Sequence, residues 1–240
     1  MRNVLKKIHI LVLLGMILCL YSLPSSAEEA GNAIGSTSLL SKEDQMILEK
    51  LTNTKTAKLS NQIILVVDHD LMLWTKDTAG NWSKKLDTYC GYGRNGLKAF
   101  NIRQEGDGTT PIGSFPILFS FGFGQNPGTA MTYREIQPTS YWSAEESTYN
   151  TWVESATQID GEHLSEYTIC YKKAMAIGFN QNPTVYKRGS AIFLHLKNPA
   201  HWSTSGCVAV EEEAMNTLLS TCQDGTYIMI VPDINWIQNF

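Results

Sequence analysis

The sequence predicts a mostly-β domain of the sandwich or barrel kind, preceded by an N-terminal segment that lies outside the fold. Short apolar runs recur between turns rich in Gly, Pro and Asn, which is typical of such β domains. Helical periodicity is clear only near the two ends of the chain. The 240 residues are 43% hydrophobic and 18% charged, which indicates one globular domain large enough to bury a core without disulfides.

The first 27 residues have the composition of a secretory signal peptide. Arg2, Lys6 and Lys7 form a basic start, and an apolar run follows over residues 8–20. Small residues then lead to a predicted cleavage site after Ala27. An uncleaved membrane anchor is the alternative, but the apolar run is shorter than the ~20 residues that span a bilayer. We therefore expect export, with no membrane span after cleavage.

The charge of the remaining chain argues against nucleic-acid binding. The whole sequence has 19 Lys and Arg against 23 Asp and Glu, and removing residues 1–27 leaves 16 against 23, a net charge of about −7. No basic block is present, so the electrostatic signature of a nucleic-acid-binding protein is missing. The five His residues are scattered, so we expect no metal site and no cofactor.

Four cysteines follow the predicted signal peptide: Cys90, Cys170, Cys207 and Cys222. An even number in an exported chain suggests disulfides, although their spacing is wide. If one of them is catalytic, at least one of the other three is unpaired. Cys19 lies inside the apolar run after Leu18, which disfavours a lipoprotein signal. The disulfide pairing stays open.

Residues 28–60 read as a lead-in to the domain. Residues 28–38 are small and polar, as in a flexible segment. Ser41, with Asp44 three residues later, has the pattern of a helix start, and apolar residues follow on one face up to Leu51. Residues 52–60 are polar again and are expected to form a linker.

The β pattern begins at Asn61. Residues 63–67 and 71–74 predict two strands joined by a turn. Further strands are expected around residues 114–121, 167–178, 191–196 and 227–231. The intervening segment 125–166 is long, aromatic and polar, and we expect a loop there. Its aromatic side chains either pack on the sheet or line a substrate groove.

One helix is expected near the end of the chain, directly after Cys207. Ala214, Leu218 and Cys222 recur every four residues from Val210. Acidic residues 211–213 lie in the first turn, where negative charge suits the helix dipole.

The segment that joins the expected strand at 191–196 to this helix carries the candidate chemistry. His195 lies at the end of the apolar run 191–196, and Cys207 follows twelve residues later, after Ser205 and Gly206. An imidazole can take the proton of a thiol whose ordinary pKa is ~8.5, and a helix start or a group of backbone N–H groups favours the thiolate. The same N–H groups can stabilise an oxyanion. The alternative is a structural cysteine beside a buried histidine.

Two separated motifs resemble the L,D-transpeptidase (YkuD-like) family of peptidoglycan enzymes. The first is Gly-Asp-Gly-Thr-Thr-Pro-Ile-Gly-Ser-Phe at residues 106–115. The second is Ile-Phe-Leu-His at 192–195 followed by Thr-Ser-Gly-Cys-Val at 204–208. The strand at 63–67, the pair Tyr149-Asn150 and the triplet Glu162-His163-Leu164 also resemble one branch of the family. The resemblance extends over residues 61–232 and leaves residues 233–240 as a C-terminal tail.

The resemblance implies a mostly-β L,D-transpeptidase catalytic fold and a set of roles. Cys207 matches the nucleophile and His195 the general base. Gly206 and Ser205 match the active-site loop that stabilises the oxyanion. His163 lies in a family-like motif and is a candidate substrate-binding residue, although it can equally pack or hydrogen-bond beneath the loop.

The implied function is that of an exported enzyme that acts on peptidoglycan stem peptides. A Cys207 thioester formed on a stem tetrapeptide would be resolved by an amine, giving a 3→3 cross-link, or by water, as in an L,D-carboxypeptidase or amidase. A catalytically silent wall-associated domain is the third alternative. Many family members have His where this chain has Ser205, and Arg or Asn where it has Ala209, so the choice between transfer and hydrolysis stays open.

Overall fold

The computed structural model describes residues 40–240. The expected signal peptide at residues 1–27 lies outside the described residues. The domain is mostly β with few helices, as predicted. None of its helices is long and apolar enough to cross a membrane.

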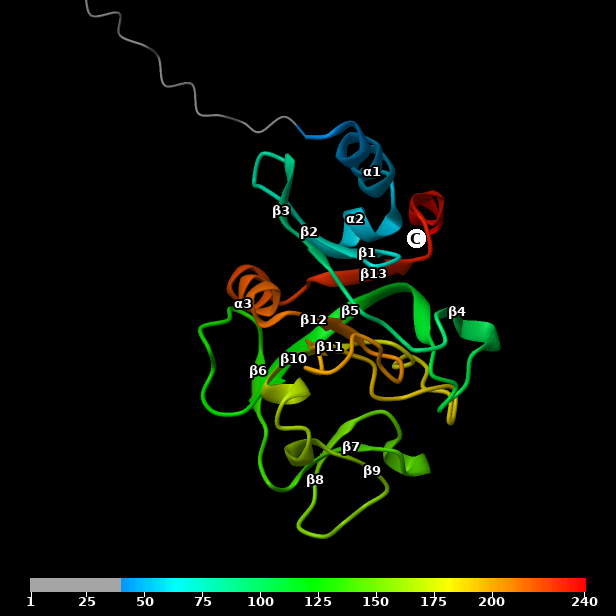
Figure 1. Cartoon of the computed structure of the whole chain (residues 1–240), viewed down its shortest axis with the longest axis vertical. Helices are drawn as coiled ribbons and strands as arrows, with labels where there is room; N and C mark the ends of the chain where they lie inside the picture. The colour runs from blue at the N-terminus through cyan, green and yellow to red at the C-terminus, as the bar shows by residue number, and fades with distance from the viewer. Residues whose placement is uncertain (1–39) are drawn as a thin grey trace, which may run out of the picture. The chain divides into compact units, whose positions relative to one another are not determined.

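The strands fall into two sheets (Figure 1). The strands of the large sheet are β1 (Gln62–Val67), β2 (Asp70–Lys76), β3 (Trp82–Tyr89), β4 (Leu97–Ala99), β5 (Thr110–Gly122), β6 (Tyr133–Glu135), β10 (Lys173–Ile177), β11 (Phe193–Leu196), β12 (Val208–Val210) and β13 (Tyr227–Val231). Those of the small sheet are β7 (Ser140–Ser143), β8 (Trp152–Glu154) and β9 (Gly161–His163).

The helices are short. The α-helices are α1 (Lys42–Thr52), α2 (Lys55–Leu59) and α3 (Glu212–Thr221). The 3-10 helices are η1 (Phe100–Ile102), η2 (Glu146–Thr148), η3 (Leu164–Glu166), η4 (Cys170–Lys172) and η5 (Ile234–Asn239).

The large sheet curls around one long strand. Its order is β12-β11-β10-β5-β13-β1-β2-β3, with β4 and β6 also paired to β5. The first part of β5 pairs with β13 and the later part with β10, so this one strand joins both halves of the sheet. The inner face buries a core that includes Ile64, Leu194, Val208 and Met215 of α3. Successive side chains of a strand point to opposite faces, so the runs that are apolar throughout are buried on both sides.

The segments at both ends of the described chain cover the outer face of β1, β2 and β13. Helix α1 forms as predicted, and the Ser41 hydroxyl accepts from the Asp44 N–H at 3.0 Å. Leu51 of α1 packs with Trp74 of β2 and with Ile237 of η5 in a second core. In Figure 1, α1, α2 and the C-terminus lie together on this side of the sheet.

The expected linker at 52–60 is wrong in part, because it contains α2. The Thr54 hydroxyl caps this helix by accepting from Ala57 N–H at 3.0 Å, and it donates to the Leu51 carbonyl at 2.7 Å. A buried threonine therefore starts a short helix in a segment whose polarity suggested a linker. Thr56 and Ala57 are the residues that this helix buries.

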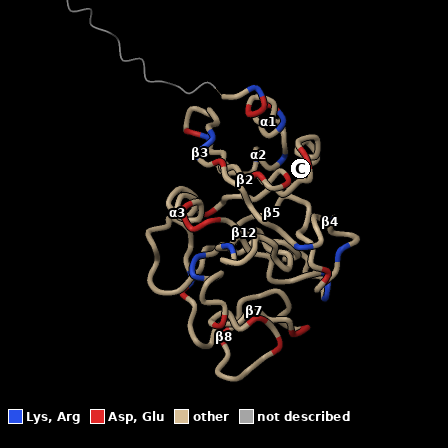
Figure 2. Tube along the Cα trace, viewed as in Figure 1, with Lys and Arg blue, Asp and Glu red and all other residues tan. Residues whose placement is uncertain are grey.

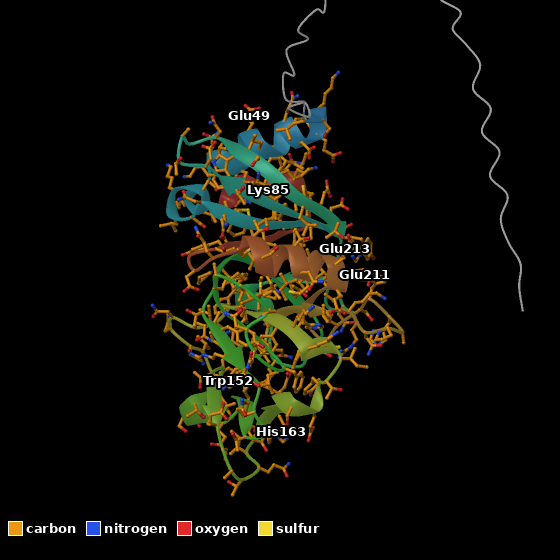
Figure 3. All side chains as sticks on the ribbon, turned by 90° about the vertical axis from the view of Figure 1, so that its left-hand side faces the viewer. Glu49, Lys85, Trp152, His163, Glu211 and Glu213 are labelled. Carbon is orange, nitrogen blue, oxygen red and sulfur yellow. The ribbon has the colours of Figure 1, made fainter. Side chains whose placement is uncertain are left out.

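The expected loop at 125–166 is also wrong in part, since it contains β6 and the whole small sheet. Trp142 and Trp152 of this sheet pack edge-on or tilted against Phe119 of β5, with ring centroids 6.3 and 5.9 Å apart. Figure 3 shows Trp152 in the small sheet, at the opposite end of the domain from Glu49 of α1. The small sheet thus covers the outer face of β5, β10 and β11 and forms a third core there.

The helix expected directly after Cys207 begins later than predicted. Residues 208–210 form β12, which pairs in parallel with β11 and is fully buried. Two β-branched valines favour this strand, and helix α3 starts only at Glu212. Its acidic first turn and its buried Ala214 and Leu218 are as predicted.

Candidate functional site

A cavity of about 810 Å³ opens between the end of β11, the loops around it and the small sheet. Cys207 and His195 both line it, so the structure brings together the two residues that the sequence singled out. The other lining residues come from four segments: Arg94, Arg103, Glu105 and Gly106; Trp142, Ala144, Asp160, Gly161 and Glu162; Tyr167, Cys170, Tyr171, Gly189, Ser190, Ala191 and Ile192; and Asn198, His201, Ser203, Thr204 and Ser205.

His195 reaches the cavity because of the strand alternation along β11. Leu194 and Leu196 point into the main core, which leaves Phe193 and His195 on the opposite face. The imidazole is buried and its Nδ1 lies 2.8 Å from the Leu196 carbonyl oxygen. A carbonyl only accepts, so Nδ1 carries the proton and Nε2 is left as a basic nitrogen. The ring of Tyr171 meets the imidazole edge-on, with centroids 5.6 Å apart.

The Cys207 thiol is held by backbone groups at the base of the cavity. Its Sγ lies 3.3 Å from the Ala191 carbonyl oxygen, to which the S–H donates, and 3.3 Å from the Phe193 N–H, which donates to it. Within residues 40–240, no hydrogen bond joins this thiol to the imidazole of His195. A rotation of the side chain is therefore required before His195 takes the thiol proton.

Both groups are uncharged in the resting structure. Burial raises the pKa of the Cys207 thiol far above its ordinary value, and the nearby Glu162 carboxylate raises it further. Burial lowers the pKa of His195 to about 4, so its imidazole is neutral at neutral pH. The thiolate-stabilising helix start that the sequence suggested is missing, because β12 separates Cys207 from α3. The pair is a thiol beside a neutral base.

The first sequence motif supports the loop that carries Cys207. The Thr110 hydroxyl donates to the Gly206 carbonyl at 2.7 Å, with a second contact to the Cys207 carbonyl at 3.2 Å, and accepts from Gly93 N–H at 2.9 Å. Gly206 has φ +147°, and a Cβ there would lie 3.0 Å from the Thr109 carbonyl oxygen. Only glycine fits this backbone without strain. The two motifs therefore form one structural unit.

Asp107 organises the turn within this motif. Its Oδ1 accepts from the Thr109 N–H at 2.9 Å and from the Thr109 hydroxyl at 2.6 Å, and its Oδ2 accepts from the Gln104 N–H at 3.0 Å. Burial acts in the opposite direction, but these bonds and Lys98 hold the pKa of Asp107 well below its usual range. The side chain is an ionised anchor for the loop.

Arg103 is a buried cation under the same loop, and the sequence analysis did not identify it. Its Nη2 donates to the Thr109 carbonyl at 2.9 Å and lies 3.8 Å from Asp107 Oδ1. The guanidinium also stacks over the Phe179 ring at 4.6 Å, and its Nε is buried without a hydrogen-bond partner. A guanidinium stays charged even where burial lowers its pKa, as it does here.

Asn150 holds the other side of the thiol. It is only 2% exposed, and its Oδ1 accepts from the Ala191 N–H at 3.2 Å and from the Trp142 indole at 2.9 Å. Its Nδ2 donates to the carbonyls of Phe179 and Asn180, both at 2.9 Å. Ala191 has a positive φ of 54°, which is uncommon for alanine, and its carbonyl accepts the Cys207 thiol. Asn150 therefore fixes the position of Ala191, and the Ala191 carbonyl in turn holds the Cys207 thiol.

The predicted loop residues Ser205 and Gly206 both lie next to Cys207. The Ser205 hydroxyl accepts from Arg94 Nη1 at 3.0 Å, and Arg94 is exposed at the cavity rim. The Gly206 N–H donates to the Thr204 hydroxyl at 3.0 Å, and that hydroxyl donates to the Cys207 carbonyl at 2.7 Å. The Gly206 N–H is thus already engaged in the resting structure.

His163 does not line the cavity. Its ring stacks on Tyr141 with centroids 4.3 Å apart, and its Nε2 lies 2.6 Å from the Pro138 carbonyl oxygen. Figure 3 shows His163 in the small sheet. Alternation along β9 instead directs its neighbour Glu162 to the cavity.

Glu162 and Tyr171 are cavity residues that the sequence analysis did not single out. The Tyr171 hydroxyl donates to Glu162 Oε2 at 2.5 Å, and burial raises the pKa of the Glu162 carboxyl. Glu162 stood inside a family-like triplet, but its direction depends on the register of β9 with β7, which no local signal gives.

The remaining cysteines are free thiols in the described part of the chain. Cys90 and Cys222 are buried, and burial raises the pKa of each to about 12. Cys170 is half-buried and shares the cavity with Cys207. Between residues 40 and 240, no three His, Cys, Asp or Glu side chains converge in a way that holds a metal ion.

A buried thiol and a basic imidazole nitrogen in one cavity can carry out acyl transfer through a thioester, the chemistry of cysteine-nucleophile enzymes. Comparison with known proteins gives the family. The L,D-transpeptidase catalytic domain (YkuD) matches residues 61–231, and the chain belongs to this family of cysteine-nucleophile L,D-transpeptidases.

Two further comparisons concern a solved structure and the curated proteins. An L,D-transpeptidase (Yku) structure from Stackebrandtia nassauensis matches at 9% identity and a TM-score of 0.34, covering 80% of this chain and 68% of that one. Among curated proteins, none matches.

Proposed function

We propose that this protein is an exported L,D-transpeptidase that forms 3→3 cross-links between peptidoglycan stem peptides, or exchanges their terminal D-Ala. Cys207 is the nucleophile and His195 the general base. The observation that carries the proposal is the shared cavity of these two side chains within a YkuD domain. The Cys207 thiol and the His195 imidazole need neither a metal nor a cofactor for this chemistry.

In the first step, His195 Nε2 takes the Cys207 proton and Sγ attacks the carbonyl before the terminal D-Ala of a stem tetrapeptide. The C–N bond breaks, the proton returns from His195 to the leaving amine, and a thioester remains. The Cys207 N–H stabilises the oxyanion, and the Gly206 N–H joins it once its bond to the Thr204 hydroxyl is released. An acceptor amine then replaces the sulfur.

Hydrolysis of the thioester is the second candidate outcome. Two departures from the usual family pattern, Ser205 and Ala209, keep the choice between transfer and hydrolysis open. Water in place of an amine makes the protein an L,D-carboxypeptidase.

One experiment separates the alternatives. Purified protein is incubated with tetrapeptide-rich muropeptides, and the products are followed by mass spectrometry. New 3→3 dimers support transfer, whereas loss of D-Ala without dimers supports hydrolysis. No change in either product supports a silent wall-associated domain. Cys207→Ala is the control and abolishes both products; retention of full activity by this variant would overturn the proposal.

Export is part of the same proposal and has its own test. It rests on the composition of residues 1–27, with cleavage expected after Ala27. N-terminal sequencing of the protein from culture supernatant or cell wall is expected to begin at Glu28.

A further inference from the structure

One wall of the catalytic cavity is acidic, and that wall belongs to the small sheet. Residues 136–171 contain six Asp and Glu and no Lys or Arg. Figure 2 shows acidic residues along the β7 and β8 region and basic residues near β4, on another side of the domain. The cavity residues Trp142 and Glu162 come from β7 and β9 of this sheet, whereas Arg94 lies on a different wall.

Two acidic residues of this wall, Asp160 and Glu162, line the cavity. Asp160 is exposed, whereas Glu162 is half-buried and the Tyr171 hydroxyl donates to its Oε2 at 2.5 Å. Tyr171 is buried and its ring meets the imidazole of His195. Tyr171 therefore contacts both the carboxyl and the general base, and burial together with the negative charge of Glu162 raises the pKa of the Cys207 thiol.

No cation of the described chain neutralises this carboxylate. The ion pairs within residues 40–240 do not include Glu162, although other acids of the domain, such as Asp44 and Asp107, have Lys or Arg partners. A carboxylate removed from water without a counter-charge is unfavourable, so burial raises the pKa of Glu162. A cation that enters the cavity removes this cost and forms a charge-assisted hydrogen bond.

We propose that Glu162 binds the primary ammonium group of the acyl acceptor and takes one of its protons. This inference rests on the proposed transpeptidase function. It assigns to the small sheet the recognition of an amine-bearing stem peptide and makes Glu162 the residue that favours transfer over hydrolysis.

The protons balance as follows. The ammonium gives one proton to the Glu162 carboxylate and becomes a free amine. The amine nitrogen attacks the Cys207 thioester carbonyl, the C–S bond breaks and an amide C–N bond forms. The second amine proton passes through His195 to the sulfur and restores the thiol. Glu162 then loses its proton to water. A carboxyl with a raised pKa is better suited to this task than an ordinary one.

The test compares Glu162→Gln with Glu166→Gln. Gln keeps the size of the side chain and removes the charge; Glu166 lies nearby on η3, is largely exposed and does not line the cavity. With stem tetrapeptide as donor and an amine acceptor of varied concentration, Glu162→Gln is expected to raise the acceptor KM and to lower the ratio of cross-linked to hydrolysed product about tenfold. Glu166→Gln is expected to match the unaltered protein.

The outcomes distinguish this inference from the proposed function. If the unaltered protein forms no thioester, the proposed function fails. If it forms cross-links and Glu162→Gln gives the same acceptor KM and product ratio, the amine-binding role fails. An equal loss of thioester formation and of transfer would also contradict it, because that places Glu162 on the donor side. Thermal unfolding shows whether Glu162→Gln is folded, and Glu162→Asp, which keeps the charge, is expected to restore most of the product ratio.

Discussion

At the scale of single residues, reactivity depends on where two protons lie. The Cys207 S–H donates a hydrogen bond to the Ala191 carbonyl, and the His195 Nδ1–H donates one to the Leu196 carbonyl. Both groups are therefore uncharged in the resting enzyme. Substrate entry has to break the first of these bonds before proton transfer. Cys207 of the resting enzyme is thus expected to react slowly with alkylating reagents, unlike the cysteine of an enzyme with a preformed thiolate.

The pH dependence of acylation follows from the same two groups. Burial lowers the pKa of His195 to about 4, so the imidazole is a competent base at neutral pH and loses this role as pH falls through about 4. Burial raises the pKa of Cys207, so no thiolate appears near neutrality. We expect the rate at which a chromogenic β-lactam acylates Cys207 to stay constant between about pH 6 and 8. An inflection near the ordinary histidine value, ~6.5, would contradict this assignment.

Asn150 offers a second residue-scale prediction. Asn150→Ala leaves the Trp142 indole and the Ala191 N–H without their acceptor. We expect a loss of about 2–4 kcal/mol in the free energy of unfolding, measured in urea, and slower acylation of Cys207 in the folded protein. Asn150→Asp keeps an accepting oxygen but places a buried carboxylate oxygen against the Phe179 and Asn180 carbonyls, so it is expected to be at least as destabilising. A loss below about 1 kcal/mol in Asn150→Ala, with an unchanged acylation rate, would contradict the role assigned to Asn150.

At the scale of elements, the active-site loop depends on β5. Thr110→Val keeps the shape of the side chain but removes the hydrogen bond to the Gly206 carbonyl. We expect a cost of about 1–3 kcal/mol and a reduced acylation rate at Cys207, because a buried carbonyl loses its donor. Thr217→Val on α3, where the half-buried hydroxyl donates only to the Glu213 carbonyl of its own helix, is the matched control and should change neither quantity. An unaltered acylation rate in Thr110→Val would show that the two motifs are not mechanically linked.

The layer of α1, α2 and η5 is expected to stabilise the domain without taking part in catalysis. Leu51 of α1 is completely buried against the outer face of the sheet. Leu51→Ala should lower the free energy of unfolding by about 2–5 kcal/mol, measured by urea denaturation. The acylation rate of the folded variant should remain that of the unaltered protein. A large loss of rate would place this layer in the mechanism.

The sequence was informative wherever a local pattern determined the structure. The apolar strands β1, β2, β11 and β13 and the Ser41 cap were accessible from composition and spacing. The Cys207–His195 site depended on the two motifs that resemble the L,D-transpeptidase family. Strand β3 was missed because its Lys-rich, half-exposed residues carry no continuous apolar run. The helix after Cys207 was placed too early because a three-residue buried strand resembles the start of an apolar helix face. Asn150 and Glu162 were not singled out because their roles depend on contacts between segments distant in the sequence.

At the scale of the whole molecule, the curled sheet and the small sheet have different roles in the cavity. The large sheet, through β11 and the loop before β12, holds the thiol and the imidazole. The small sheet closes the cavity with Trp142 and supplies its acidic wall. This arrangement leaves Cys207 between a basic rim at Arg94 and an acidic wall at Glu162, which suits a substrate that carries both charges.

The central claim is that Cys207 becomes acylated by a stem peptide. Intact-protein and peptide mass spectrometry after brief incubation with a stem tetrapeptide tests it most directly. We expect an adduct on Cys207 with the mass of the tripeptide acyl group, absent in Cys207→Ala and strongly reduced in His195→Ala. An adduct on Cys170, or turnover of the tetrapeptide with no adduct on Cys207 and full activity in Cys207→Ala, would contradict the account.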